Sequence, residues 1–204
     1  MSAPTEFLFA TGNAHKVAEM AAIADALGPR VRIRGAKEVG GMPPVVENAG
    51  TFAGNAAKKA RVLHVVHPEA WVLADDSGLC VDAIDGEPGV ESANYAGPAA
   101  PGPKNIAKLL RELKGVPAER RRAHFVCVLY VVLPDGREFG FKGRVDGTIL
   151  NAPRGEGGFG YDPVFRPDGF RKSFAELGAA VKNPISHRGC AWAKLGKWLR
   201  DGGG

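Results

Sequence analysis

Hydrophobic residues follow two patterns along the chain, and each pattern predicts a different kind of element. Short apolar or alternating runs predict strands at 6–10, 31–34, 71–74, 79–84, 123–133 and 138–149. Apolar residues that recur every three or four positions predict helices at 14–27, 51–67 and 104–113. Ser186 is a suitable N-cap for a final helix through Leu199, and 173–177 suits a short helical turn. A Pro-Asp-Gly turn at 134–136 predicts that the last two strands pair antiparallel.

The apolar run at 71–74 ends in Asp75, Asp76, Ser77 and Gly78. In an open α/β sheet, ligands bind just outside the carboxyl ends of the strands. Because adjacent strand residues point to opposite faces, we expect Asp75 and Asp76 to do different jobs. One would face a site as a metal ligand or general base, and the other would hold the turn. The alternative, more common for such a cluster taken alone, is a plain Asx-turn with Gly78 at positive φ.

The first predicted strand leads directly into a polar turn and then into a helix. The turn consists of Thr11, Gly12, Asn13, Ala14, His15 and Lys16. Backbone amides at a helix start bind anions well, and Lys16 adds a cation within the first turn, so this segment is a candidate phosphate site. It is not a Walker loop, because GxxxxGK[ST] is absent. Asn13 could instead serve only as the helix N-cap.

Further candidates lie in two polar regions. A loop rich in Gly and Pro at 36–50 contains Glu47, and the helix after Thr51 carries Lys58 and Lys59. Successive helical residues diverge by about 100°, so only one of the two lysines can reach a given phosphate.

The glycine-dense segment 155–165 sets Phe159 and Tyr161 among glycines, which suits a platform for a flat ring. The alternative is a plain loop whose aromatic side chains pack inward. His187 and Arg188, in the first turn of the final helix, could donate hydrogen bonds to a ligand rich in acceptors, or could simply decorate the surface.

Composition narrows the class of protein. The 204 residues suit one domain or two lobes with a shared core, and 45% hydrophobic and 24% charged residues are typical of a soluble globular protein. The net charge of +5 favours polyanionic partners, although the basic cluster at 119–122 lacks aromatics and is read as a solvated surface. Three widely spaced cysteines indicate reduced thiols rather than a disulfide framework or a zinc site. We find no membrane-spanning run, secretory signal or GxSxG nucleophile motif.

Together these features indicate one kind of ligand. The phosphate turn is joined by acidic metal candidates (Glu47, Asp75, Asp76), an aromatic glycine loop, and cations (Lys59, Lys182, Arg188). Mg²⁺ takes one or two carboxylates and phosphate oxygens, and phosphorus chemistry depends on positioning and charge neutralisation. The set therefore fits a Mg-nucleoside triphosphate.

Four segments closely resemble the inosine/xanthosine triphosphate pyrophosphatase family, or Ham1-like proteins: TGNAHK, LADDSGLCVDAIDGEPGVESANYAG, GEGGFGYDPVF and ISHRGCA. The resemblance implies a two-lobed α/β fold over 1–204, with an elongated mixed β-sheet flanked by helices and a nucleotide-binding cleft between the lobes. It also implies a homodimer that uses Mg²⁺ to convert ITP, dITP and XTP to the monophosphate and pyrophosphate, and the three unpaired cysteines favour a cytoplasmic location. This activity cleanses the nucleotide pool of deaminated purines and involves neither nucleic acid nor membrane.

The resemblance also implies roles for individual residues. Asp76 matches the proton acceptor and a metal ligand, and Glu47 lies where the family has an acidic metal ligand. The implied substrate contacts are Thr11, Gly12, Asn13, Ala14, His15, Lys16, Lys59, Ser77, Phe159, Gly160, Tyr161, Asp162, Lys182, His187 and Arg188. Many relatives carry paired glutamates followed by Thr-Gly before the second helix, whereas this chain has Val-Glu-Asn-Ala-Gly at 46–50.

Two other functions compete with this reading. A Maf-type pyrophosphatase would act on pyrimidine or modified nucleotides, and the Ser-His-Arg and Phe-Gly-Tyr-Asp segments argue against it. A nucleic-acid-binding module would use the positive charge and bind in a salt-sensitive way without turnover, but it leaves the acidic cluster unexplained.

Overall fold

The structure is a computed structural model that describes residues 6–27 and 31–203. Its sheet has the strand order β2-β1-β3-β4-β5-β6. The strands are β1 (Glu6–Phe9), β2 (Arg32–Gly35), β3 (Val72–Val81), β4 (Arg122–Val132), β5 (Glu138–Ile149) and β6 (Phe165–Pro167). β1 pairs parallel with β2 and β3, whereas β6 pairs antiparallel with β5. The predicted α/β class with a mixed sheet is confirmed.

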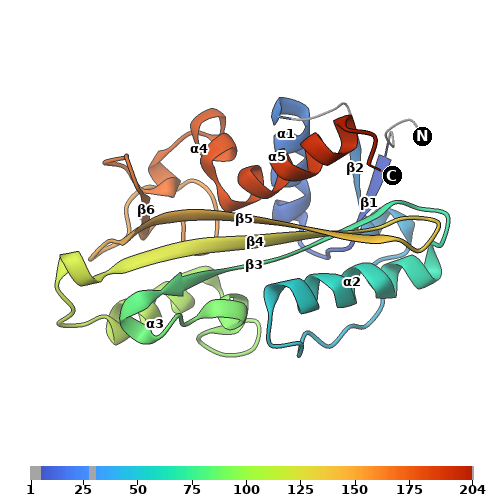
Figure 1. The fold of residues 1–204 in the computed structure, drawn as a ribbon. Helices are drawn as coiled ribbons and strands as arrows, with labels where there is room; N and C mark the ends of the chain where they lie inside the picture. Colours follow the sequence, from blue (N-terminus) through green and yellow to red (C-terminus); the bar gives the residue numbers. More distant parts are fainter. Residues whose placement is uncertain (1–5, 28–30, 204) are drawn as a thin grey trace. The chain divides into compact units, whose positions relative to one another are not determined.

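Helices and short 3₁₀ turns connect the strands (Figure 1). The helices are α1 (Ala14–Leu27), α2 (Phe52–Val66), α3 (Gly102–Glu112), α4 (Ala179–Ile185) and α5 (His187–Arg200). The 3₁₀ turns are Ala36–Val39, Asp82–Ile84, Gly89–Asn94, Ala118–Arg120 and Phe174–Glu176. No helix in the described ranges has both the length and the apolar composition needed to cross a bilayer.

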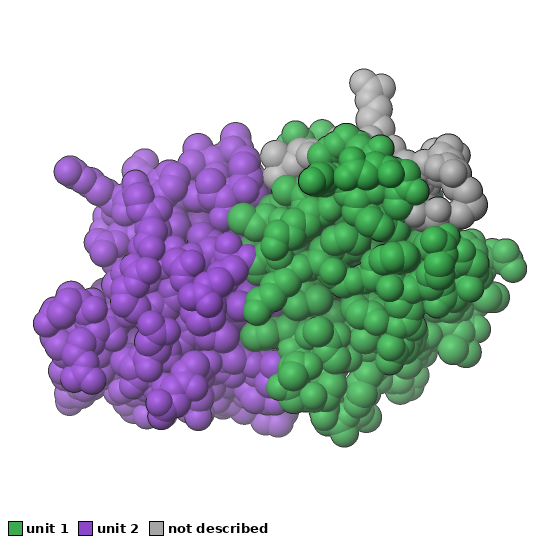
Figure 2. Space-filling model, in the orientation of Figure 1, with its two compact units in different colours: residues 1–76, 127–143, 187–204 green, residues 77–126, 144–186 purple. Residues whose placement is uncertain are grey.

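The chain forms two compact units (Figure 2). Unit 1 consists of residues 1–76, 127–143 and 187–204, and unit 2 consists of 77–126 and 144–186. In unit 1, α1 and α5 cover one face of the sheet and α2 covers the other (Figure 1).

Because side chains alternate along a strand, β3 contributes to the apolar cores on both faces of the sheet in unit 1. Leu73 belongs to the core that contains Met20 of α1 and Trp192 of α5. Val72 and Ala74 belong instead to the core that contains Ala60 and Leu63 of α2. The two residues that follow Ala74 continue this alternation.

Unit 2 has its own core, rich in aromatic side chains. Phe125 of β4 meets Phe165 of β6 at a centroid distance of 4.7 Å and stacks on Phe174 at 6.2 Å. The apolar face of α3, with Ile106 and Leu109, packs into the same cluster.

The predicted end of the third strand at Ala74 is wrong. β3 continues through Asp75, Asp76, Ser77 and Gly78 to Val81, and Gly78 is part of the strand rather than of a turn. The local polar residues predict a turn because such side chains usually bind nearby backbone groups. Here both carboxylates accept instead from cations on helices, so the strand does not have to end.

The basic cluster at 119–122, predicted to be solvated, divides in two. Arg120 and Arg122 are exposed, whereas Arg121 is only 4% exposed. Its guanidinium donates to three carbonyl oxygens, those of Leu113, Ile149 and Leu150, each at 3.0 Å. Arg121 therefore joins the end of α3 to the end of β5.

Replacing Arg121 with Met should destabilise the protein, because the carbonyl groups of Leu113, Ile149 and Leu150 lose the hydrogen bonds from the guanidinium at once. We expect the free energy of unfolding to fall by about 2–4 kcal/mol, measured by urea denaturation. The matched control is Arg120→Met, an exposed neighbour whose replacement should change it by less than about 0.5 kcal/mol. Equal effects of the two substitutions would contradict the structural role of Arg121.

Candidate active site

Asp75 and Asp76 lie side by side in β3 but face different helices. Asp75 is 1% exposed and accepts hydrogen bonds from Lys16 of α1 at 2.9 Å and from Arg188 of α5 at 3.1 Å. Asp76 accepts from Lys59 of α2 at 2.9 Å and from Asn55 of the same helix at 3.4 Å. The two acids thus have different surroundings, as the strand alternation predicts.

The two surroundings shift the carboxyl groups in opposite directions. Burial alone would raise the pKa of Asp75, but the charges of Lys16, Arg188 and Lys59 outweigh it and hold that pKa far below its usual range. Burial raises the pKa of Asp76, and the ammonium group of Lys59 offsets this only in part. Asp75 is therefore a fixed anion, whereas Asp76 is the stronger base of the pair.

Lys59 lies between two acids. Its Nζ donates to Asp76 at 2.9 Å and to Glu47 at 2.8 Å. Burial by itself would lower the pKa of Lys59, but the charges of Asp75, Asp76 and Glu47 raise it. Lys58 turns away and donates to Asn48, so only one of the two lysines reaches the acids, as helical geometry predicts.

Glu47 and Asp76 are the candidate ligands for a divalent cation. The two carboxylates already share one positive charge, that of Lys59, and the side chain of Glu47 is 45% exposed. Within the described ranges, no group of three or more His, Cys, Asp or Glu residues is arranged to hold a metal. Mg²⁺ needs only one or two carboxylates because it keeps waters and takes phosphate oxygens, so this donor set fits Mg²⁺.

The predicted phosphate turn forms the start of α1. Asn13 Oδ1 accepts from the amides of His15 at 2.9 Å and Lys16 at 3.4 Å, so Asn13 is a helix N-cap. The Asn13 amide donates to Thr11 Oγ1 at 3.2 Å. In the described part of the chain, the amides of Gly12 and Ala14 make no hydrogen bond. The turn can therefore offer two backbone donors and the ammonium of Lys16 to an anion.

The first turn of α5 is buried rather than a surface decoration. Arg188 Nη1 donates to Glu19 at 3.0 Å and contacts His187 Nε2 at 3.3 Å. A guanidinium only donates, so Nε2 of His187 is the acceptor and its neutral ring carries the proton on Nδ1. Gly143 of β5 lets α5 approach this closely, because a Cβ there would overlap the carbonyl of His187.

Unit 2 holds the other predicted contacts. Asp162 is buried and accepts from the amide of Phe159 at 2.9 Å and from Lys182 Nζ at 2.7 Å. The same Nζ lies 5.5 Å from the centroid of the Phe159 ring. Tyr161 packs inward and donates to the carbonyl of Ser92 at 2.9 Å, whereas Phe159 is half-buried and Gly160 is exposed. Of the two aromatic side chains, only Phe159 is therefore placed to serve as a platform for a flat ring. Ser77, another predicted substrate contact, is half-buried in β3.

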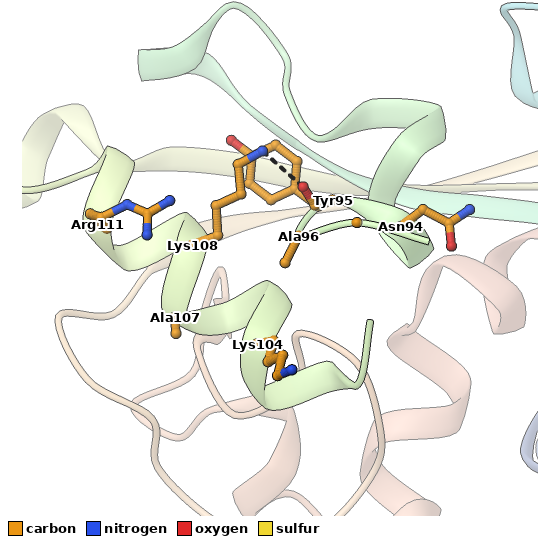
Figure 3. Close-up of a pocket in the computed structure, with 8 residues that line it drawn as sticks. Asn94, Tyr95, Ala96, Lys104, Ala107, Lys108 and Arg111 are labelled. Atoms are coloured by element: carbon orange, nitrogen blue, oxygen red, sulfur yellow. Dashed lines mark hydrogen bonds between the residues drawn. The ribbon is translucent and has the colours of Figure 1, made fainter. Parts of the chain in front are cut away.

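A separate hollow of about 680 Å³ in unit 2 contains none of the predicted site residues (Figure 3). Lys104, Lys108 and Arg111 of α3 line it together with Asn94, Tyr95, Ala96, Gly97 and Ala107. Lys108 lies over the ring of Tyr95 at 4.0 Å and donates to the Tyr95 carbonyl at 2.8 Å. This lining has no acid to accept a proton, so it does not resemble a hydrolytic centre.

The sequence analysis did not single out two residues that contact the charged side chains around Asp75 and Asp76, namely Asn55 and Glu19. Asn55 lies four residues before Lys59 and therefore on the same face of α2; its Oδ1 also accepts from the amide of Ala49 at 3.0 Å, next to the Glu47 loop. Glu19 lies three residues after Lys16 on α1. Helical spacing from the two lysines was the signal that could have found both.

Comparison with known proteins identifies the family of this chain. The Ham1 family model matches residues 7–198. A dITP/XTP pyrophosphatase of Opitutus terrae is 57% identical over 196 residues, which cover 94% of this chain and 97% of that protein. A dITP/XTP pyrophosphatase of Geobacillus kaustophilus is 48% identical over 192 residues, which cover 93% of this chain and 92% of that protein. The solved structure of the Staphylococcus aureus Ham1 protein has 38% identity and a TM-score of 0.84, with 97% and 99% covered. The chain belongs to the Ham1 family.

Proposed function

We propose that this protein hydrolyses ITP, dITP and XTP to the nucleoside monophosphate and pyrophosphate. The observation that carries the proposal is the carboxylate of Asp76, which has a raised pKa and is held by Lys59 and Asn55 in a chain of the Ham1 family. The names of the related proteins, dITP/XTP pyrophosphatases, support the substrate class.

The proposed chemistry needs a base next to the phosphates. Asp76 takes a proton from the attacking water, whose oxygen forms a bond to the α-phosphorus while the bond to the bridging oxygen breaks and pyrophosphate leaves. Lys16 and Lys59 stabilise the negative charge that develops on the phosphate oxygens. Mg²⁺, held by Glu47 and Asp76, supplies further charge neutralisation when it is bound.

The selection of one purine base over another follows from the hydrogen-bond donors that the protein presents to it. Hypoxanthine and xanthine present a 6-oxo acceptor where adenine presents an amino donor. Arg188 and the Nδ1–H of His187 are donors, so an adenine would leave donors facing donors. Sites built on hydrogen bonds discriminate strongly against groups that leave buried polar atoms unpaired. Phe159, Tyr161, Asp162 and Lys182 are the proposed contacts to the nucleoside.

We infer further that both units act as one pyrophosphatase domain, in a cytoplasmic homodimer. The coverage of 94% of this chain by a single relative supports the one-domain assignment.

Pyrophosphate release should be fast for ITP, dITP and XTP and at least about 100-fold slower, in kcat/KM, for ATP. The reason is the donor lining of the proposed purine site. EDTA should abolish the activity and excess Mg²⁺ should restore it, because the carboxylates of Glu47 and Asp76 repel a triphosphate unless a divalent cation neutralises the charge between them. Comparable rates on ATP and ITP would refute the proposed substrate class.

Replacing Asp76 with Asn should lower kcat for dITP by about 10²–10⁴-fold. The reason is that the amide has no basic site for the proton of water. The melting temperature of the variant should stay above the assay temperature, so that the enzyme is folded when kcat is measured. Asp82→Asn, an exposed acid just after the end of β3, is the matched control and should keep kcat within about twofold. Near-normal turnover by Asp76→Asn would remove this residue from the mechanism.

A further inference from the structure

The proposed reaction leaves one buried acid of β3 without a role. Each oxygen of Asp75 binds a different cation. Oδ1 accepts from Lys16 at 2.9 Å, and Oδ2 accepts from Arg188 Nε at 3.3 Å and Nη2 at 3.1 Å. Lys16 lies on α1 and Arg188 on α5, so one carboxylate links two helices that carry proposed substrate contacts.

Glu19 completes the cluster by accepting from Arg188 Nη1 at 3.0 Å. The two cations and two anions neutralise one another, which a buried cluster of charges requires. Lys16 is the most exposed of the four, at 19% of its side chain, against 11% for Glu19, 4% for Arg188 and 1% for Asp75. Lys16 is therefore the member that a phosphate can reach most readily.

We propose that Asp75 is a positioning residue that fixes Lys16 and Arg188 together for one substrate, Lys16 for its phosphates and Arg188 for its purine. The inference rests on the proposed function, which supplies both contacts. Lysine and arginine side chains lose rotamer freedom when they bind a ligand, and an ion pair formed beforehand reduces that loss. Asp75 acts on substrate binding through these two cations and does not touch the reacting atoms.

The test is Asp75→Asn, which keeps the side-chain volume but turns one oxygen into an amide donor. Whichever way the amide points, a donor then faces Lys16 or Arg188. We expect KM for dITP to rise about tenfold or more and the preference for dITP over dATP, as a ratio of kcat/KM, to fall about threefold or more. Both are read from steady-state pyrophosphate release, with the melting temperature recorded in parallel.

A purely structural Asp75 would behave like a core residue. Leu199→Ala, in the apolar core of α5, is the matched control: it should lower the melting temperature without changing KM or the preference for dITP. If Asp75→Asn shows this same pattern, the proposal is wrong. In a Lys16→Met background, Asp75→Asn should raise KM by a smaller factor than it does in the wild type, because only Arg188 is left to be positioned; full additivity would also overturn the proposal.

If Asp75→Asn does not fold, Glu19→Gln tests the same cluster while Asp75 stays in place. It should reduce the preference for dITP about threefold, because Arg188 loses one of its two carboxylates. An unchanged preference would overturn the proposal. Failure of the proposed function is a separate outcome: the wild-type protein itself would then release no pyrophosphate from dITP.

Discussion

Two adjacent carboxylates in a buried strand are the constraint on which unit 1 depends. Taking an ionised carboxylate out of water costs on the order of several kcal/mol unless cations and hydrogen bonds compensate. Asp75 and Asp76 point to opposite faces of β3, so each face must supply its own cation. Lys16 and Arg188 do so from α1 and α5, and Lys59 does so from α2. The helices that cover the apolar part of β3 thus also carry the charges that its polar part requires.

The same arrangement gives the two acids different proton affinities. Asp75, with a cation on each oxygen, has a pKa far below the usual range and stays ionised as a fixed support. Asp76 has a raised pKa, and it shares the ammonium group of Lys59 with the half-exposed Glu47. Asp76 is therefore both the more basic acid and the one paired with a second carboxylate. Neighbouring residues of one strand therefore differ in basicity because they differ in surroundings, not in type.

Local periodicity was enough to predict much of the fold. The bounds of α1 and β5 agree with the predicted ranges 14–27 and 138–149, since both segments have clear patterns and polar or glycine boundaries. The continuation of β3 could not be read locally, because the partners of Asp75 and Asp76 lie 59, 113 and 17 residues away. The prediction that Arg121 is solvated is wrong for the same reason: an arginine among arginines predicts exposure to solvent, and only the fold brings three carbonyl groups to it.

Site residues were predictable as members of recognisable segments, but their partners were not. The role of Asn13 as an N-cap and the inward packing of Tyr161 were each one of two interpretations open to the sequence. Asn55 and Glu19 could be found only once the lysines on their helix faces were known to point at β3.

The central claim is that a bound triphosphate lies beside Asp76 with its phosphates on Lys16 and Lys59. The most direct measurement is a crystal structure of the inactive Asp76→Asn variant with dITP and Mg²⁺. The account predicts the α-phosphate next to residue 76, phosphate oxygens within hydrogen-bond distance of both lysines, and the purine at Arg188. Triphosphate density well away from residue 76 and Lys16 would contradict it.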